Sequence, residues 1–305
     1  MFLPTGLVLV LFGLRLLQSG LLCLSSGRLT TALRSLSINP TRSSLSGLVA
    51  SALTQSSTAV SIITIGLAHS RIINLSQAIA VILGANVGTT LTVQFLSLNP
   101  GIAMLPFCAA GIPIAFSRSP AKPLGQIFVG VGMIFSGLDL LNRAFEPLQH
   151  APWFAAGLAA AGSNYLLAVS AAAVLTAFLH SSSAATGIVM ALYAQGAVSL
   201  ETAVALVLGN NIGTCFTALI ASLTSSAAGK RVALAHLLLN IIGAVVFLPL
   251  IRPFSFLIGI TSSFPARQVA NAHVIYNLAS SLIALPFCNQ LARILERIIP
   301  DRATW

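Results

Sequence analysis

The sequence predicts an all-α, polytopic membrane protein built from two inverted repeats, and three observations lead to this prediction. The first is composition: of 305 residues, 56% are hydrophobic and only 7% are charged, against about 25% charged in a soluble domain. A mean hydropathy of +0.95 excludes intrinsic disorder as well. The second observation is a series of apolar segments of membrane-spanning length. The third is an internal repeat at an offset of about 125 residues.

The apolar segments are assigned by length, because a spanning helix needs about 20 predominantly apolar residues. Two further apolar stretches, 45–69 and 164–197, are interrupted by polar clusters. Such a break is tolerated in a membrane only where protein or a cavity surrounds it, so we expect two re-entrant helical hairpins. The first segment lacks a basic leader and contains Arg15, which argues against a cleaved signal peptide. About seven spans are predicted: 2–24, 74–98, 101–117, 124–142, 200–224, 232–251 and 266–289.

The repeat is visible in three motifs. Gly-Ala-Asn-Val-Gly-Thr-Thr at 84–90 returns as Gly-Asn-Asn-Ile-Gly-Thr-Cys at 209–215, and Gln-Ser-Ser-Thr-Ala at 55–59 returns as His-Ser-Ser-Ser-Ala at 180–184. The first and fourth spans share Gly-Leu-x-Leu-Leu. Asn beside Gly within a span also marks a place where a helix can break. The predicted organisation is repeat 1 at 1–121, repeat 2 at 122–251, and an additional span with a short tail at 252–305.

Each repeat contains a span, a hairpin and two more spans, so an odd number of crossings inverts the second repeat. Placing the N-terminus outside and the C-terminus in the cytoplasm satisfies the positive-inside rule and predicts the cell (inner) membrane as the location. Inverted repeats with broken helices are typical of secondary transporters. In this arrangement Arg28, Arg34, Arg42, Arg71, Arg118, Lys122, Lys230, Arg231, Arg293, Arg297 and Arg302 are cytoplasmic, and Arg143, Arg252 and Arg267 are external.

The chemistry of the expected site follows from the scarcity of acidic residues. Of five Asp and Glu residues, only Asp139 falls inside a span. A centre rich in hydroxyls and amides suits an anion, which also favours the N-termini of broken helices. Sodium can bind there through hydroxyl and carbonyl oxygens. The sequence thus predicts a sodium-coupled anion carrier whose empty site is formally neutral.

Gln-Ser-Ser followed by Gly-Ala-Asn-x-Gly-Thr-Thr, repeated in both halves, resembles the type II sodium/phosphate cotransporter family in its bacterial branch. Runs at 132–138, 231–240 and 272–277 also look like that family. The resemblance implies sodium-driven symport of inorganic phosphate by alternating access. Many bacterial members carry a cytoplasmic regulatory domain after the last span, which we expect to be absent here. The resulting assignments are phosphate binding by Gln55, Ser56, Ser57, Thr58, His180, Ser181, Ser182 and Ser183, and sodium binding by Asn86, Thr89, Thr90, Asn211, Thr214 and Thr217.

Two departures from the family pattern bear on the alternatives. His180 stands where Gln is usual and could add pH sensitivity, and Cys215 replaces a Thr. A carrier of another oxyanion or small organic anion remains open. An intramembrane hydrolase using His180 and Ser181 is remote, because neighbouring residues on a helix do not face each other and no orienting acid or GxSxG motif accompanies them. A channel is disfavoured by the inverted hairpins.

The expected partners are inorganic phosphate, sodium and the lipid bilayer. Basic residues are scattered, so nucleic-acid binding is not expected. An enzymatic role, a cofactor and a metal other than sodium are not expected either. A homodimer is expected only by analogy with other hairpin carriers. Arg15 and Asp139 occupy equivalent places and could pair, although snorkelling to the interface is favoured. The pairs His236/Asn240 and His273/Asn277 have helical i, i+4 spacing and predict interhelical hydrogen bonds or support for the site.

Overall fold

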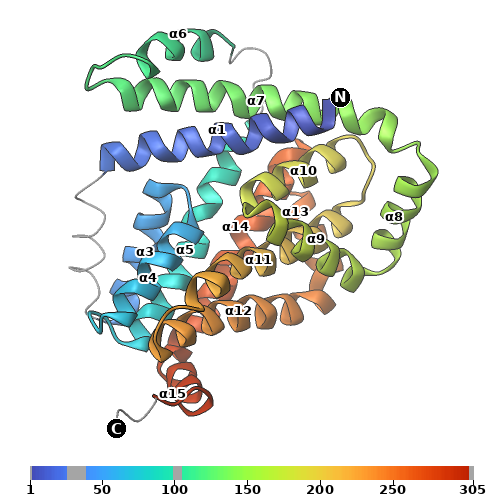
Figure 1. Ribbon diagram of the computed structural model, residues 1–305. Helices are drawn as coiled ribbons and strands as arrows, with labels where there is room; N and C mark the ends of the chain where they lie inside the picture. The colour runs from blue at the N-terminus through green and yellow to red at the C-terminus, as the bar shows by residue number, and fades with distance from the viewer. Residues whose placement is uncertain (1, 26–38, 99–104, 302–305) are drawn as a thin grey trace.

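A computed structural model describes residues 2–25, 39–98 and 105–301, and all regular secondary structure in these ranges is helical (Figure 1). Arg28, Arg34 and Arg302 lie outside the described residues. The all-α prediction is confirmed. Two short 3₁₀ turns, Leu248–Leu250 and Leu285–Phe287, join α12 to α13 and α14 to α15. The helices are α1 Phe2–Ser25, α3 Pro40–Thr54, α4 Ser57–His69, α5 Leu75–Leu96, α6 Leu105–Ala115, α7 Lys122–Leu148, α8 Pro152–Ser163, α9 Tyr165–Leu179, α10 Ser182–Ala194, α11 Leu200–Ser222, α12 Ala227–Phe247, α13 Ile251–Gly259, α14 Pro265–Ala284 and α15 Cys288–Ile298.

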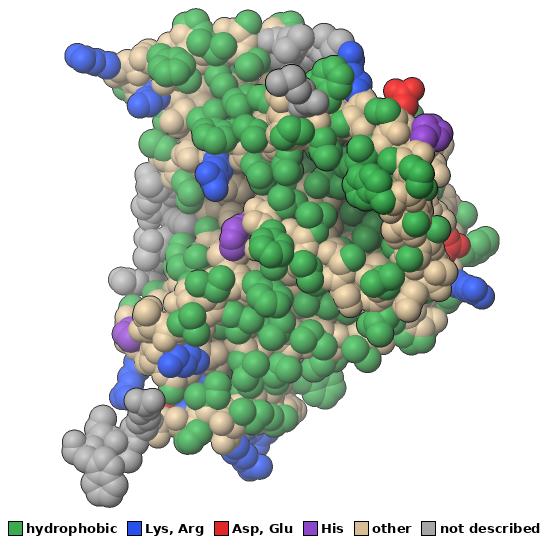
Figure 2. All heavy atoms as spheres, turned by 45° about the vertical axis from the view of Figure 1, so that its right-hand side comes forward, with side chains coloured by type: hydrophobic (Ala, Val, Ile, Leu, Met, Phe, Trp, Pro, Cys, Tyr) green, Lys and Arg blue, Asp and Glu red, His purple; other side chains and the backbone are tan. Residues whose placement is uncertain are grey.

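Six helical segments in the described part of the chain are long and apolar enough to cross a membrane. They include α1, α5, α7 and α11, and the continuous segments Ala227–Gly259 and Pro265–Ile298. Many large apolar side chains on these helices are exposed, as lipid contact requires. Figure 2 shows hydrophobic side chains over most of one face, with basic side chains mainly towards its margins. The chain is therefore a polytopic membrane protein.

The predicted span 101–117 differs from the structure. Residues 101–104 lie outside the described residues, and the remainder forms α6, an 11-residue helix with Pro113 inside it. At 1.5 Å per residue this helix covers about 16 Å, roughly half the hydrocarbon thickness. Its described length is too short for a complete crossing.

The two hairpins have the same backbone. Moving α3 and α4 by 125 residues gives the bounds of α9 and α10. Each hairpin turns at one left-handed residue, Gln55 (φ 55°, ψ 29°) or His180 (φ 53°, ψ 24°). In Figure 1 the first hairpin lies left of centre and the second lies right of it, on opposite sides of the molecule. The broken helices predicted at the polar clusters are present in both places.

The Gly-x-Asn-x-Gly runs lie inside unbroken helices, so the expectation of a helix break there is wrong. A Cβ on Gly84 of α5 would meet the carbonyl oxygen of Ser44, and one on Gly209 of α11 would meet that of Val169. Val169 is Ser44 moved by 125 residues. These glycines let the first helix of each hairpin pack directly against the long helix that follows, as small residues do between membrane helices.

Helices α1 and α7 pack side by side and run in opposite directions (Figure 1). Gly6 lies against the carbonyl oxygen of Gly137, and Gly13 lies against that of Gly130. At an offset of 124 residues, Gly130 is the equivalent of Gly6 and Gly137 is the equivalent of Gly13. This reciprocal contact is the pattern of a two-fold interface. It supports the inverted repeats, while the boundaries at 1–121, 122–251 and 252–305 stay predictions.

Three helices were not predicted from the sequence. Helix α8 is a largely exposed, Ala- and Gly-rich helix between α7 and the second hairpin. Helix α13 continues the predicted span 232–251 to Gly259, and α15 extends the span 266–289 to Ile298. In α15 the buried side chains of Cys288, Ala292 and Leu295 form one face, opposite charged residues. Its amphipathic pattern suits a position at the membrane boundary.

Candidate functional site between the hairpin tips

The tips of both hairpins line a single cavity of about 100 Å³. Since the hairpins approach from opposite sides, residues distant in sequence meet there. Helix α1 forms another wall with residues spaced by helical turns. All eight residues predicted to bind phosphate are among those that line the cavity. The lining comprises Leu11, Leu14, Arg15, Gln18, Gln55, Ser56, Ser57, Thr58, Thr89, Leu179, His180, Ser181, Ser182 and Ser183.

Two helix N-termini face this cavity. Ser56 caps α4, because its hydroxyl accepts a hydrogen bond from the N–H of Ala59 at 3.1 Å, and Ser181 caps α10 in the same way through Ala184 at 3.2 Å. The first N–H groups of a helix have no partner within that helix. The cavity therefore receives backbone donors and the positive ends of two helix dipoles, a combination that attracts anions.

Equivalent side-chain contacts hold the two tips. The Thr92 hydroxyl donates to Gln55 Oε1 at 2.6 Å, and His180 Nδ1 lies 2.9 Å from the Thr217 hydroxyl. Thr217 is Thr92 moved by 125 residues. Sequence reasoning selected Thr217 and missed Thr92, although the repeat offset could have found it. On the first tip, Gln18 Nε2 of α1 also donates to the Gln55 carbonyl oxygen at 3.0 Å.

Among the residues predicted to bind sodium, Thr89 is the one that lines the cavity. Its hydroxyl lies 2.7 Å from that of Ser51 and donates to the Ala85 carbonyl at 3.0 Å. The Thr90 and Thr214 hydroxyls donate to backbone carbonyls of their own helices. The structure thus brings the phosphate set together around the cavity, but places most of the sodium set in the helices behind it.

Asn86 and Asn211 are held by two matching hydrogen-bonded clamps. His236 Nε2 lies 3.2 Å from Asn86 Oδ1, and Asn86 Nδ2 donates to Asn240 at 3.4 Å. On the other side, His273 Nε2 lies 3.0 Å from Asn211 Oδ1, and Asn211 Nδ2 donates to Asn277 at 3.3 Å. The expectation of interhelical hydrogen bonds is confirmed. Helix α12 therefore holds α5 of the first repeat, and α14 holds α11 of the second repeat.

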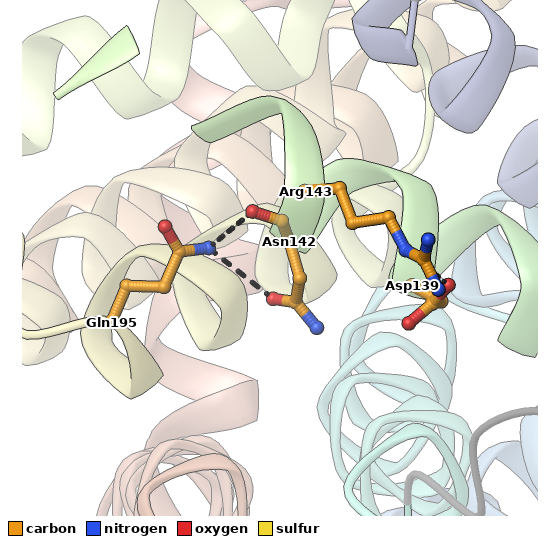
Figure 3. Close-up of polar contacts among 4 residues, drawn as sticks. All are labelled: Asp139, Asn142, Arg143 and Gln195. Carbon is orange, nitrogen blue, oxygen red and sulfur yellow. Dashed lines mark hydrogen bonds and ion pairs between the residues drawn. The ribbon is translucent and has the colours of Figure 1, made fainter. Parts of the chain in front are cut away.

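Arg15 and Asp139 do not pair. The Asp139 carboxylate instead accepts a hydrogen bond from Arg143 at 3.0 Å, one turn along α7 (Figure 3). Arg15 lines the cavity from α1. Sequence reasoning favoured snorkelling and left Arg15 out of the site, because its position between the hairpins depends on how α1 packs. The site consequently contains a guanidinium, which corrects the expectation of a formally neutral centre.

The bases of the hairpins are fixed by different residues. At the end of α10, Gln195 Nε2 donates to the Asn142 carbonyl of α7 at 2.9 Å (Figure 3). At the end of α4, His69 Nδ1 accepts a hydrogen bond from the N–H of Ser226 at 3.0 Å, just before α12. Each hairpin is therefore attached at its base to a neighbouring helix as well as at its tip.

His180 and Ser181 do not form a nucleophile–base pair. The Nδ1 atom of His180 contacts Thr217, and the Ser181 hydroxyl caps α10. The left-handed turn between the helices directs the two side chains to different partners. This geometry gives no support to an intramembrane hydrolase.

Comparison with known proteins agrees with this picture. Residues 9–143 and 150–264 match the model of a family described as Na+/Pi-cotransporter. "Uncharacterized protein YqeW" of Bacillus subtilis is 32% identical over 247 residues, which cover 80% of each chain. "Putative inorganic phosphate export protein YjbB" of Salmonella typhimurium is 30% identical over 303 residues, which cover 97% of this chain but only 55% of YjbB.

A shorter match involves the human protein "Sodium-dependent phosphate transport protein 2C", which is 45% identical over 85 residues, 27% of this chain and 14% of that protein. No solved structure matches the chain. The family match extends over both hairpins, both long helices and most of the spans. The chain therefore belongs to the Na+/Pi-cotransporter family, a family of transporters and not of enzymes.

Proposed function

We propose that this chain is a secondary symporter that couples sodium to inorganic phosphate by alternating access. The observation that carries the proposal is the single cavity to which both hairpin tips contribute hydroxyl groups and helix N-termini. No carboxylate is among the residues that line it. An anion is stabilised by such donors and would be repelled by carboxylates.

The choice of phosphate rests on the cavity and on the relatives together. A volume of about 100 Å³ favours a small inorganic anion over an extended organic one. The names of YjbB and of the human 2C protein both refer to phosphate. A carrier of the same fold for another small oxyanion is the remaining alternative, and direct competition between anions distinguishes the two.

Sodium is proposed as the coupling ion because the human 2C protein is named sodium-dependent and because hydroxyl and carbonyl oxygens suit a hard cation. Thr89 is best placed to contribute directly, since it lines the cavity. Asn86, Thr90, Asn211, Thr214 and Thr217 remain the other proposed sodium residues, located in the helices behind the cavity.

Alternating access requires parts that move as units, and the glycine contacts suggest which parts these are. Helix α3 packs on α5, and α9 packs on α11, with no side chain between the backbones at Gly84 and Gly209. Each hairpin and its long helix would therefore move together. Sodium would order the tips, phosphate would bind between them, and movement of one unit against the other would open the cavity to the opposite side. The proposed setting is the inner membrane, with the N-terminus outside.

The experiment is phosphate flux in proteoliposomes under one imposed ion gradient at a time. We expect accumulation of labelled phosphate with an inward sodium gradient, and none with a proton gradient alone. Vesicles preloaded with phosphate would test the export direction in the name of YjbB, and should release phosphate when sodium is also inside. Flux driven by protons without sodium would overturn the sodium assignment. Sulfate uptake that phosphate does not inhibit would overturn the phosphate assignment.

A further inference from the structure

We infer that Arg15 is the charged group that binds the transported oxyanion, and that the first repeat alone supplies this charge. The inference rests on the proposed function, because it deepens the assignment of the same cavity. It starts from the position of Arg15, which is the Lys or Arg residue among those lining the cavity.

Arg15 is placed in the middle of its helix. It lies 13 residues after Phe2, where α1 begins, and 10 residues before Ser25, where α1 ends. At 1.5 Å per residue it is about 15 Å or more from either end. An arginine that only snorkelled would be expected near a helix end, whereas an ionisable residue in the middle of a span is most often functional.

The backbone that carries Arg15 is held firmly. Two residues before it, Gly13 packs against the backbone of Gly130 in α7. Three residues after it, Gln18 donates a hydrogen bond to the Gln55 carbonyl at the first hairpin tip. Leu11, Leu14, Arg15 and Gln18 share one helical face, and all four line the cavity. The backbone that carries Arg15 is therefore fixed at the wall of the cavity.

The charge of Arg15 is not neutralised by protein. Among the described residues, neither of the two ion pairs includes Arg15, and no hydrogen bond to its side chain is seen. Its repeat equivalent, Asp139, forms an ion pair with Arg143 and does not line the cavity. A planar guanidinium presents several donors in a fork that matches two oxygens of a phosphate group.

The arrangement also defines what Arg15 does to sodium. A positive charge attracts the oxyanion and repels a nearby cation. Removing the charge must therefore weaken phosphate binding without weakening sodium binding. A purely structural role for Arg15 would have a different signature, because damage to the cavity would reduce both affinities together.

The test is equilibrium binding of labelled phosphate and, separately, of labelled sodium to the purified protein. We expect Arg15→Gln to lower phosphate affinity about 10- to 150-fold, as loss of a charge-assisted hydrogen bond does, while sodium affinity measured without phosphate stays equal or rises. Arg15→Lys should recover part of the loss, since it keeps the charge and loses the fork. Arg143→Gln, which removes a basic residue of α7 outside the cavity, is the matched control and should bind phosphate within about twofold of wild type.

The possible failures are distinguishable. Wild-type protein that binds no phosphate at any sodium concentration would overturn the proposed function, and this inference with it. Wild-type binding that Arg15→Gln leaves unchanged would overturn the inference alone. Parallel loss of phosphate and sodium binding in both Arg15 variants would assign Arg15 a structural role and would also overturn it.

Discussion

The two repeats have the same backbone conformation at the hairpin tips but different side chains around the cavity. Gln55 and His180 adopt the same left-handed conformation to within a few degrees, and Ser56 and Ser181 cap the following helices in the same way. The glycines of α5 and α11 receive equivalent carbonyl groups from α3 and α9. At these close contacts the two halves are alike, although Gly47 of α3, which lies against the Val81 carbonyl, has Ala172 as its equivalent.

The side chains around that backbone have diverged. The first tip carries Gln55 where the second carries His180, and the first span carries Arg15 where the fourth carries Asp139. Only Arg15 of that last pair lines the cavity. The comparison teaches that both repeats keep the tip conformation and the glycine contacts of α5 and α11, whereas the site needs only a set of donors from both sides and tolerates different ones.

The largest effect is expected where the repeats are most alike. Gly84→Ala or Gly209→Ala would place a Cβ against the carbonyl oxygen of Ser44 or Val169, at a separation too small for packed atoms. Backbone cannot yield there without separating the hairpin from its long helix. We expect both variants to lose the folded, monodisperse protein in detergent, as measured by size-exclusion chromatography with fluorescence detection.

Gly66→Ala is the matched control, because Gly66 is also helical but nothing lies within 4 Å of an added Cβ. It should fold normally, or slightly better, since alanine favours the helix. If Gly84→Ala folds as well as Gly66→Ala does, the close packing that unites hairpin and long helix is not essential, and the idea of two rigid units fails.

The same contrast explains which features could be predicted from the sequence. The hairpins and the tips were predictable because the polar clusters at 55–59 and 180–184 interrupt apolar stretches and recur at one offset. The glycine runs were recognised, but their role was misjudged: a Gly-Asn pair in one sequence cannot distinguish a helix break from a close contact with another helix. That distinction depends on Ser44 and Val169, which carry no local signal.

Arg15 shows a second limit of sequence reasoning. Its side chain is found in the cavity because α1 packs on α7 through Gly13 and Gly130 and contacts the tip through Gln18. Those contacts join segments that are distant in sequence. Hydropathy alone does not tell which face of a helix points towards the cavity. Apolar composition alone likewise predicts a full span at 101–117, where the structure has the 11-residue α6.

A smaller effect, on affinity and not on folding, is expected at the first serine of each hairpin's second helix. Ser57→Ala and Ser182→Ala each remove a hydroxyl that lines the cavity. A hydrogen bond to a charged group contributes about 1.5–3 kcal/mol, equivalent to roughly 10- to 150-fold in affinity. We expect both variants to lose sodium-dependent phosphate uptake to that degree, measured as labelled phosphate in proteoliposomes at equal protein content.

Ser163→Ala, an exposed residue at the end of α8, is the control and should transport like wild type. Equal losses at Ser57 and Ser182 would mean that both repeats bind the anion with similar strength. Loss at one position only would assign the anion to one repeat, and wild-type uptake in both variants would contradict a shared site.

The two clamps allow a comparison of stability. His236→Ala and His273→Ala each leave the side-chain oxygen of a buried or half-buried Asn without its histidine partner, which costs about 1–3 kcal/mol. We expect both to lower the melting temperature in detergent by similar amounts. His236 Nδ1 also lies 3.5 Å from the Ser61 hydroxyl of the first hairpin, whereas His273 Nδ1 has no partner within the described residues. Transport should therefore suffer more in His236→Ala, and the reverse order would contradict the link from α12 to that hairpin.

The smallest effect is expected from making the two tips chemically alike. In His180→Gln, the new amide can reach the Thr217 hydroxyl as Gln55 reaches Thr92, because the two contacts are equivalent and the backbone conformation is shared. We expect sodium-dependent uptake within about threefold of wild type, since one hydrogen bond of about 1 kcal/mol replaces another. Histidine is the side chain that most readily changes charge between about pH 5 and pH 8, so any pH dependence of wild-type uptake that stems from the tip should flatten in this variant. Uptake measured across that range, with Gln55→His as the reciprocal variant, checks the idea.

A large loss of transport in His180→Gln at every pH would show that His180 has a role that Gln55 does not share, and that the second tip is more than a copy of the first.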